Sequence, residues 1–197
     1  MRVFLYRIIF VILRCVMFLV HPVLKVKGRE RIPEGACVIC PNHSALSDPV
    51  WLVLALHLKQ MINIMAKIQL SHVPVIGPFL GYMGIIYVDR DRADVGAIKS
   101  SLTVLKADRP LVIFPEGTRV KPGKEVHAHT GAALLASRTD APLIPVYITK
   151  NKKFLHPIHV VFGEPFRVEK AGVKATGSEL PSATDELMQK IYELEEP

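Results

Sequence analysis

The chain has 197 residues, enough for one compact domain with an appendage. Half of its residues are hydrophobic, and lysine and arginine outnumber aspartate and glutamate by 25 to 18, which favours an anionic membrane surface or an anionic substrate. No zinc-finger, helix-turn-helix or RNP-like pattern supports nucleic-acid binding, and three cysteines are too few for a disulfide scaffold.

Residues 3–24 form an apolar run that Arg7, Arg14 and His21 interrupt at seven-residue spacing. On a helix this spacing gives one thin polar stripe. Arg14 would lie near the centre of a spanning helix, where a charge is costly. We therefore expect residues 1–27 to form a membrane-associated helix that lies in the interface or dips into one leaflet, with its arginines reaching lipid phosphates.

A spanning anchor and a buried helix of the domain are the alternatives for this N-terminal segment. A cleaved signal peptide does not fit, because Arg14 breaks the apolar core and no A-x-A-like site follows.

The remaining residues, 28–197, alternate short apolar runs with helical patterns, which predicts one α/β domain with a central sheet flanked by helices on both sides. We expect strands over 36–40, 62–65, 84–88, 111–114, 143–148 and 159–162. We expect helices over 49–58, 93–107, 131–137 and 183–194. Residues 25–35 are expected as a polar connection, 74–78 as a turn and 121–129 as a polar loop.

His43 and Asp48 lie five residues apart, between an expected strand and an expected helix. On a straight helix they would face different ways, but a loop can bring them together. Pro49 suits the first position of a helix, so Asp48 is the expected N-cap. The carboxylate could then accept from one imidazole nitrogen and leave the other as a base for a substrate hydroxyl, since no G-x-S-x-G nucleophile is present. A plain N-cap with an ordinary loop histidine is the alternative.

Residues 114–119, with the sequence Phe-Pro-Glu-Gly-Thr-Arg, follow an apolar strand. Gly117 and Thr118 can turn backbone N–H groups toward an anion, and Arg119 offers a bidentate fork for phosphate. Arg90, after another expected strand, could add a second phosphate ligand. The alternatives are an ordinary turn and a solvated charge cluster.

Two further patterns are typical of metal sites but are incomplete. Cys37 and Cys40 form a C-x-x-C without a second ligand pair, so we expect two core cysteines. His127 and His129 form an H-x-H with no further ligand cluster, so no metal site is predicted.

Taken together, these blocks resemble the glycerolipid acyltransferases, and most of all the 1-acylglycerol-3-phosphate acyltransferases. The four blocks occur in the family's order: Asn42-His43 with Asp48, Arg90, residues 114–119, and the Leu-Ile-Pro-Val of residues 143–146. The match covers about residues 28–165. The two longer blocks are specific in combination.

The resemblance implies a glycerolipid-acyltransferase-type αβ domain with its site at strand ends. It implies transfer of a fatty acyl group from acyl-ACP or acyl-CoA to the 2-hydroxyl of 1-acyl-sn-glycerol-3-phosphate, giving phosphatidate without a covalent acyl-enzyme and without a cofactor. His43 would be the general base and Asp48 would orient it. The substrate-binding residues would be Lys67, Arg90, Glu116, Gly117, Thr118 and Arg119, and Asn42 would hold the loop.

The partners implied by the resemblance are a lysophosphatidate acceptor, the acyl donor and membrane lipid, with no nucleic acid. The location implied is the cytoplasmic face of the cell membrane. Two positions depart from the family pattern: Ala45 stands where a serine is frequent, and Thr130 where a lysine commonly precedes Gly131. The second departure bears on the acceptor. Another lyso-lipid acceptor, a lipid-binding module with a degenerate site, and a lysophospholipid hydrolase are the alternatives.

Overall fold

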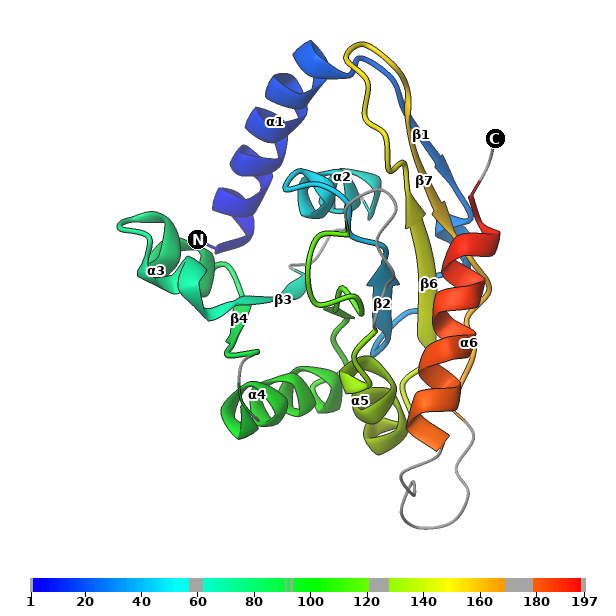
Figure 1. Ribbon diagram of the computed structural model, residues 1–197. Coiled ribbons are helices and arrows are strands. Elements are labelled where there is room, and N and C mark those ends of the chain that lie inside the picture. The colour runs from blue at the N-terminus through cyan, green and yellow to red at the C-terminus, as the bar shows by residue number, and fades with distance from the viewer. Residues whose placement is uncertain are drawn as a thin grey trace.

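A seven-stranded sheet of order β1-β7-β6-β2-β5-β3-β4 forms the centre of the protein (Figure 1). The computed structural model describes residues 2–56, 62–90, 92, 94–120, 128–168 and 179–195, with side chains described from residue 8 onward. The strands are β1 Leu24–Lys27, β2 Val38–Pro41, β3 Asn63–Lys67, β4 Ile85–Val88, β5 Leu111–Val112, β6 Leu143–Ile148 and β7 Ile158–Phe162.

Five neighbouring strands, β6, β2, β5, β3 and β4, run parallel to one another, while β7 is antiparallel to β6 and β1 is parallel to β7. The carboxyl ends of the five parallel strands therefore meet at one edge of the sheet, where ligands bind in open α/β sheets.

The helices are α1 Arg2–Val20, α2 Asp48–Leu56, α3 Ile76–Tyr82, α4 Val95–Lys106, α5 Gly131–Thr139 and α6 Glu179–Glu193, with short 3-10 turns at Arg29–Arg31 and Ile68–His72. Successive residues of β2 point to opposite faces, as the pleat requires. Ile39 belongs to the same buried cluster as Trp51 of α2, whereas Val38 belongs to a second cluster with Leu135 of α5 and Leu187 of α6. The predicted sheet with helices on both faces is confirmed (Figure 1).

The edge strand β1 lies where the sequence predicted the end of a helix and a polar connection. Its half-buried Leu24 and Val26 alternate with exposed Lys25 and Lys27, and it pairs with β7. This two-residue period marks a half-buried strand, but over four residues it is too short to outweigh the apolar run before it. The sheet therefore begins within residues 1–27, which the sequence assigned to a membrane-associated helix.

Helix α3 lies where the sequence predicted a turn at 74–78 and nothing further. Pro78 is tolerated there because the first-turn amides of a helix have no intrahelical acceptor. The chain enters the helix through Val75 at φ +65°, and Tyr87 Oη donates to Gly77 O at 2.6 Å. A tertiary hydrogen bond thus supports a helix that local propensity does not favour.

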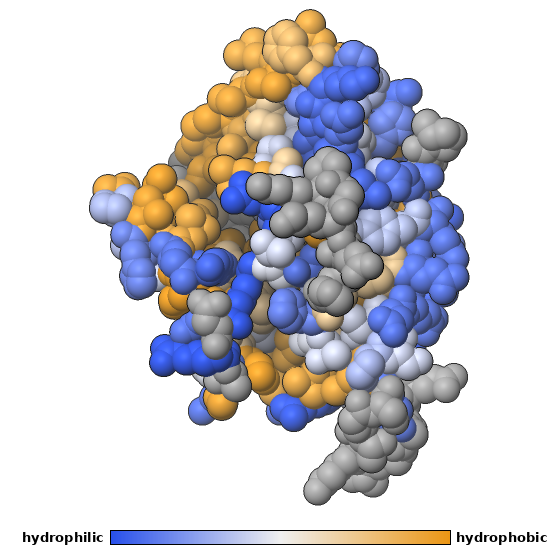
Figure 2. All heavy atoms as spheres, viewed as in Figure 1, coloured by the Kyte–Doolittle hydropathy of each residue, from blue (hydrophilic) through white to orange (hydrophobic). Residues whose placement is uncertain are grey.

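Helix α1 packs against the core beneath it through Phe10 and Met17. Its other face carries exposed apolar side chains, among them Val11, Val16 and Leu19. Figure 2 shows hydrophobic side chains gathered over α1 and α3, and hydrophilic ones over α6. Within the described residues, no helix has both the length and the apolar character that crossing a membrane requires.

The two cysteines of the C-x-x-C lie in different core clusters on opposite faces of the sheet. Both are free thiols, fully buried, and burial raises the pKa of Cys37 to about 12 and raises the pKa of Cys40 as well. They are core residues, as predicted, and they do not face a common ligand.

Candidate active site

Most of the residues singled out from the sequence lie at the carboxyl edge of the parallel strands. His43 follows β2, Lys67 ends β3, Arg90 follows β4, and Glu116 follows β5. Lys152, which the sequence did not single out, follows β6. Since β6, β2 and β5 are adjacent in the sheet, His43, Glu116 and Lys152 come from neighbouring strand ends.

The loop between β2 and α2 folds back so that His43 Nδ1 lies 3.0 Å from Asp48 Oδ2. The same Oδ2 accepts the backbone N–H groups of Ser44 at 2.6 Å and Ala45 at 2.7 Å. Asp48 is itself the first residue of α2 and is fully buried. The prediction that Asp48 caps a helix starting at Pro49 is therefore wrong, because its carboxylate binds the preceding loop and His43.

Asp48 is held ionised although it is buried. Burial alone would raise its pKa, but the hydrogen bond from His43, the charge of Lys152 and the backbone N–H of Ala45 outweigh it and lower the pKa. Lys152 Nζ lies 2.6 Å from Asp48 Oδ1, and only 8% of the Lys152 side chain is exposed.

The ring of His43 is fixed on several sides. An ionised carboxylate only accepts, so Nδ1 carries the proton and Nε2 is the acceptor. The Phe114 ring lies 4.4 Å away, centroid to centroid, at an interplanar angle of 39°. His43 N donates to Glu116 Oε2 at 2.9 Å, and His43 O accepts from Val120 N at 2.9 Å. Nε2 has no hydrogen-bond partner in the described part of the chain, so it is free to take a proton from a ligand.

Asn42 ties the start of this loop to the neighbouring strand. Its Nδ2 donates to Ile148 O at 3.0 Å, and Ile148 N donates to its Oδ1 at 2.6 Å. Asn42 is buried, and this pair of bonds replaces the sheet ladder at the point where the chain leaves β2. The geometry agrees with the predicted role of holding the loop.

Glu116 faces the protein interior. Only 3% of the residue is exposed, and its two oxygens accept from His43 N at 2.9 Å and from Tyr192 Oη, on α6, at 2.7 Å. Burial raises the pKa of this carboxyl group, and the two hydrogen bonds oppose the shift. Glu116 thus links α6 to the backbone of His43, a connection that the sequence did not reveal because no local pattern relates the two segments.

Gly117 and the exposed residues after it form the outer part of the β5 loop. Gly117 has φ +65°, a conformation that favours glycine, and a Cβ added there would clash with the His129 ring in its present position. Thr118 and Arg119 are exposed, and within the described residues their backbone N–H groups have no acceptor.

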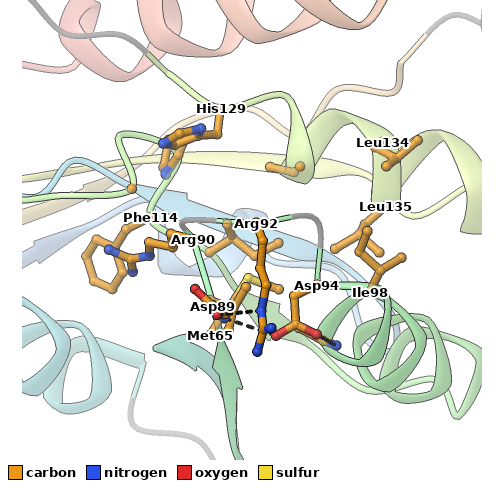
Figure 3. Close-up of a pocket in the computed structure, with 17 residues that line it drawn as sticks. Met65, Asp89, Arg90, Arg92, Asp94, Ile98, Phe114, His129, Leu134 and Leu135 are labelled. Atoms are coloured by element: carbon orange, nitrogen blue, oxygen red, sulfur yellow. Dashed lines mark hydrogen bonds and ion pairs between the residues drawn. The ribbon is translucent and has the colours of Figure 1, made fainter. Parts of the chain in front are cut away.

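A cavity of about 240 Å³ opens beside this loop (Figure 3). Most of its wall is apolar, and Phe114 both lines it and contacts His43. Of the two arginines that line it, Arg90 lies on the Phe114 side, whereas Arg92 turns to Asp89, with Nε 2.7 Å from Oδ2 (Figure 3). Partial burial lowers the pKa of Arg90. The apolar residues of the wall include Met65, Ile98, Leu134 and Leu135.

The structure brings His43 into direct contact with both Asp48 and Glu116. Arg90 and Gly117 line the adjoining cavity. Lys67 and Arg119 are exposed at the same edge and, among the described residues, neither is hydrogen-bonded or ion-paired to the dyad. His127 lies outside the described residues. Across those residues no cluster of three His, Cys, Asp or Glu side chains could hold a metal ion.

Comparison with known proteins gives the same picture over most of the chain. A sequence model of the family described as Acyltransferase matches residues 23–149. The 1-acyl-sn-glycerol-3-phosphate acyltransferase of Bacillus subtilis (strain 168) is 30% identical over 178 residues, which cover 87% of this chain and 88% of that protein. A chloroplastic 1-acyl-sn-glycerol-3-phosphate acyltransferase of Brassica napus, BAT2, is 28% identical over 142 residues, which cover 69% of this chain and 40% of that protein.

A solved structure supports the fold. The crystal structure of the 1-acyl-sn-glycerophosphate acyltransferase PlsC from Thermotoga maritima superposes with a TM-score of 0.63 at 23% sequence identity, covering 87% of this chain and 72% of that one. The family match spans more than half of the sequence and includes the loops that carry His43, Asp48 and Glu116. The chain therefore belongs to the PlsC-type acyltransferase family.

Proposed function

We propose that the protein transfers a fatty acyl group from acyl-ACP or acyl-CoA to the 2-hydroxyl of 1-acyl-sn-glycerol-3-phosphate, giving phosphatidate. The observation that carries the proposal is the 3.0 Å contact between His43 Nδ1 and buried Asp48, which leaves Nε2 without a protein partner in the described part of the chain. The relatives from Bacillus subtilis and Brassica napus are named for transfer to 1-acyl-sn-glycerol-3-phosphate, which supports the choice of acceptor.

In the reaction, His43 Nε2 takes the proton of the acceptor hydroxyl while the hydroxyl oxygen attacks the thioester carbonyl carbon. The tetrahedral intermediate then expels the thiolate, which receives the proton from the imidazolium. Asp48 stabilises the imidazolium and keeps the proton of the ring on Nδ1. A positioned base of this kind contributes about 10²–10⁴ in rate, and well-oriented reactants contribute roughly 7–11 kcal/mol.

The phosphate of the acceptor would be bound by the exposed groups of the β5 loop and the neighbouring strand ends. Arg119 offers a bidentate guanidinium, and the N–H groups of Thr118 and Arg119 are without acceptors in the described residues. Arg90 in the cavity wall and Lys67 at the end of β3 add positive charge at the same edge.

We propose further that the exposed apolar face of α1 rests on the membrane that holds the lipid acceptor. Val11, Val16 and Leu19 are 58%, 52% and 73% exposed, far more than a helix packed on all sides would allow. The loop after β6 adds Phe154 and Leu155, and Leu155 N donates to Val20 O at the end of α1. These side chains form one apolar surface beside the domain.

A panel of acceptors tests the proposal. Purified protein in mixed micelles is given acyl-CoA or acyl-ACP with lysophosphatidate, with a lyso-lipid whose phosphate carries a choline group, or with no acceptor. We expect phosphatidate with lysophosphatidate and little product otherwise. Preferred acylation of the choline lipid would point to another lyso-lipid acceptor, and release of free fatty acid without an acceptor would point to a hydrolase. No turnover with any pair would overturn the proposed activity.

A further inference from the structure

A buried lysine completes the surroundings of the dyad from outside the recognised blocks. Lys152 lies in the loop between β6 and β7, three residues beyond the end of the region that the family model matches. Its ammonium group lies 2.6 Å from Asp48 Oδ1 and 3.1 Å from Ser44 Oγ, and it also donates to Thr149 O. An ammonium group has three N–H donors. Two of them have hydrogen-bond acceptors in Ser44 and Thr149, and the ion pair with Asp48 supplies the opposite charge.

The two carboxylate oxygens of Asp48 have very different contacts. Oδ2 accepts from His43, Ser44 and Ala45, whereas Oδ1 has no hydrogen-bond donor among the described residues and is contacted there by the ammonium group of Lys152, as an ion pair at 2.6 Å. A fully buried carboxylate with an unsatisfied oxygen would be costly and would tend to protonate. The positive charge of Lys152 therefore stabilises the ionised form of the buried Asp48.

We propose that Lys152 is a positioning residue for acyl transfer: it holds Asp48 ionised and oriented so that His43 keeps its proton on Nδ1 and its base at Nε2. This inference rests on the proposed general-base role of His43. In the part of the chain that the structure describes, the titratable groups that contact the dyad are Glu116 after β5 and Lys152 after β6. Of these two groups only Lys152 is cationic, so among the described residues it is the group that balances the charge of Asp48.

The charge balance has a direct consequence for the pH profile. Without Lys152, the uncompensated Asp48 would favour the imidazolium form of His43, or Asp48 itself would take up a proton. Either change leaves less of the competent base at a given low pH, so the acid limb of the kcat/KM profile moves to higher pH. A lysine that only stabilised the fold would not move this limb.

The test compares Lys152→Met, Lys152→Arg and the matched control Lys153→Met, an exposed neighbour, in the full-length protein. We expect Lys152→Met to lower kcat roughly 10–100-fold, with less effect on the KM for the acceptor, and to shift the acid limb upward. Lys152→Arg should recover part of kcat and restore the acid limb, because it retains the charge. Lys153→Met should behave as the unmodified protein.

A double-mutant cycle with Asp48→Asn identifies the route of the effect. If Lys152 acts through Asp48, Lys152→Met causes no further loss of kcat in the Asp48→Asn protein. Fully additive losses, or an unmoved acid limb in Lys152→Met, would overturn the proposal.

A measurement without turnover keeps the proposal separate from the proposed function. The ¹⁵N NMR signals of the His43 ring, followed against pH, should show a neutral Nδ1–H ring over a wider pH range in the unmodified protein than in Lys152→Gln. Identical titrations would overturn the role of Lys152. Absence of acyl transfer by the unmodified protein would instead overturn the proposed function.

Discussion

The hydrogen bond between Tyr192 and Glu116 gives a quantitative test of how α6 supports the active site. Tyr192→Phe removes one oxygen and keeps the ring, which also packs under Lys150 Nζ at 4.4 Å from the ring centroid. The change leaves Glu116 Oε1 without its donor at 2.7 Å, in a residue that is only 3% exposed. The other oxygen stays bonded to His43 N.

The expected cost follows from burial. A buried acceptor left without a donor costs about 1–3 kcal/mol of unfolding free energy, since water cannot replace the lost hydroxyl. Tyr147→Phe is the matched control, because Tyr147 Oη donates to Glu195 Oε1 at the same 2.7 Å. The Glu195 side chain is 42% exposed and also binds Lys150, so water can serve it and the cost should be at most about 0.5–1 kcal/mol.

The loss of unfolding free energy caused by Tyr192→Phe should depend on pH. Burial raises the pKa of Glu116 above its ordinary value of 4.5 and the Tyr192 hydrogen bond opposes the shift, so losing that bond raises the pKa further. A carboxyl group with a raised folded-state pKa binds more protons when folded, and stability falls as pH rises from the ordinary value through the raised one. The stability of Tyr192→Phe falls further over this pH interval than that of the unmodified protein. The difference in unfolding free energy between the two proteins is therefore smaller in acid and larger at neutral pH.

Urea unfolding of the three proteins at about pH 5 and pH 7.5, under matched detergent conditions, measures both effects. We expect Tyr192→Phe to lose more stability than Tyr147→Phe, and the gap to widen at the higher pH. An equal cost for the two variants, or a gap that does not change with pH, would refute the burial argument for Glu116.

The loop after β5 and the exposed face of α1 give three further tests. Arg119→Ala should lower kcat/KM for lysophosphatidate by about 10–100-fold, the equivalent of a charged hydrogen bond, mainly through KM; an unchanged response to acceptor concentration would exclude a phosphate contact. Gly117→Ala should lower both the melting temperature and turnover because of its φ of +65° and the clash with His129, and adding His129→Ala should relieve only the clash; unaltered melting of the single variant would contradict this. Leu19→Glu should reduce co-sedimentation with anionic vesicles, whereas Val95→Glu on α4, equally exposed at 73%, should not; equal binding by both would mean that another surface docks.

The sequence was most informative where burial imposes a simple pattern. The strands around Ile39, Ile64 and Val112 are apolar runs covered on both faces, and such runs are recognisable without the partner elements. The helix-forming stretches also lie close to their predicted positions, with shifts of a few residues at the ends. The strand β1 and the helix α3 were missed, because the first is stabilised by pairing with β7 and the second by packing and by the Tyr87 hydrogen bond.

The candidate site divides in the same way. His43 and Asp48 are close in sequence, so their contact could be anticipated from the loop between them. The direction of the Asp48 carboxylate could not, because it depends on how that loop folds and on Lys152 from a distant strand end. Tyr192 was hidden for the same reason: it reaches Glu116 across the interface between α6 and the sheet. The position of Lys152 in the loop that follows β6 was the available signal, since β6 lies beside β2.

The central claim, that His43 is the base for acyl transfer to lysophosphatidate, is tested most directly by phosphatidate formation with purified protein and its His43→Ala variant. Both proteins are assayed with the same donor, once their melting temperatures and circular dichroism spectra have shown that the variant is folded like the unmodified protein. We expect robust turnover by the unmodified protein and a loss of about 10²–10⁴ in kcat for the variant. A folded His43→Ala protein that forms phosphatidate at the unmodified rate would contradict the claim.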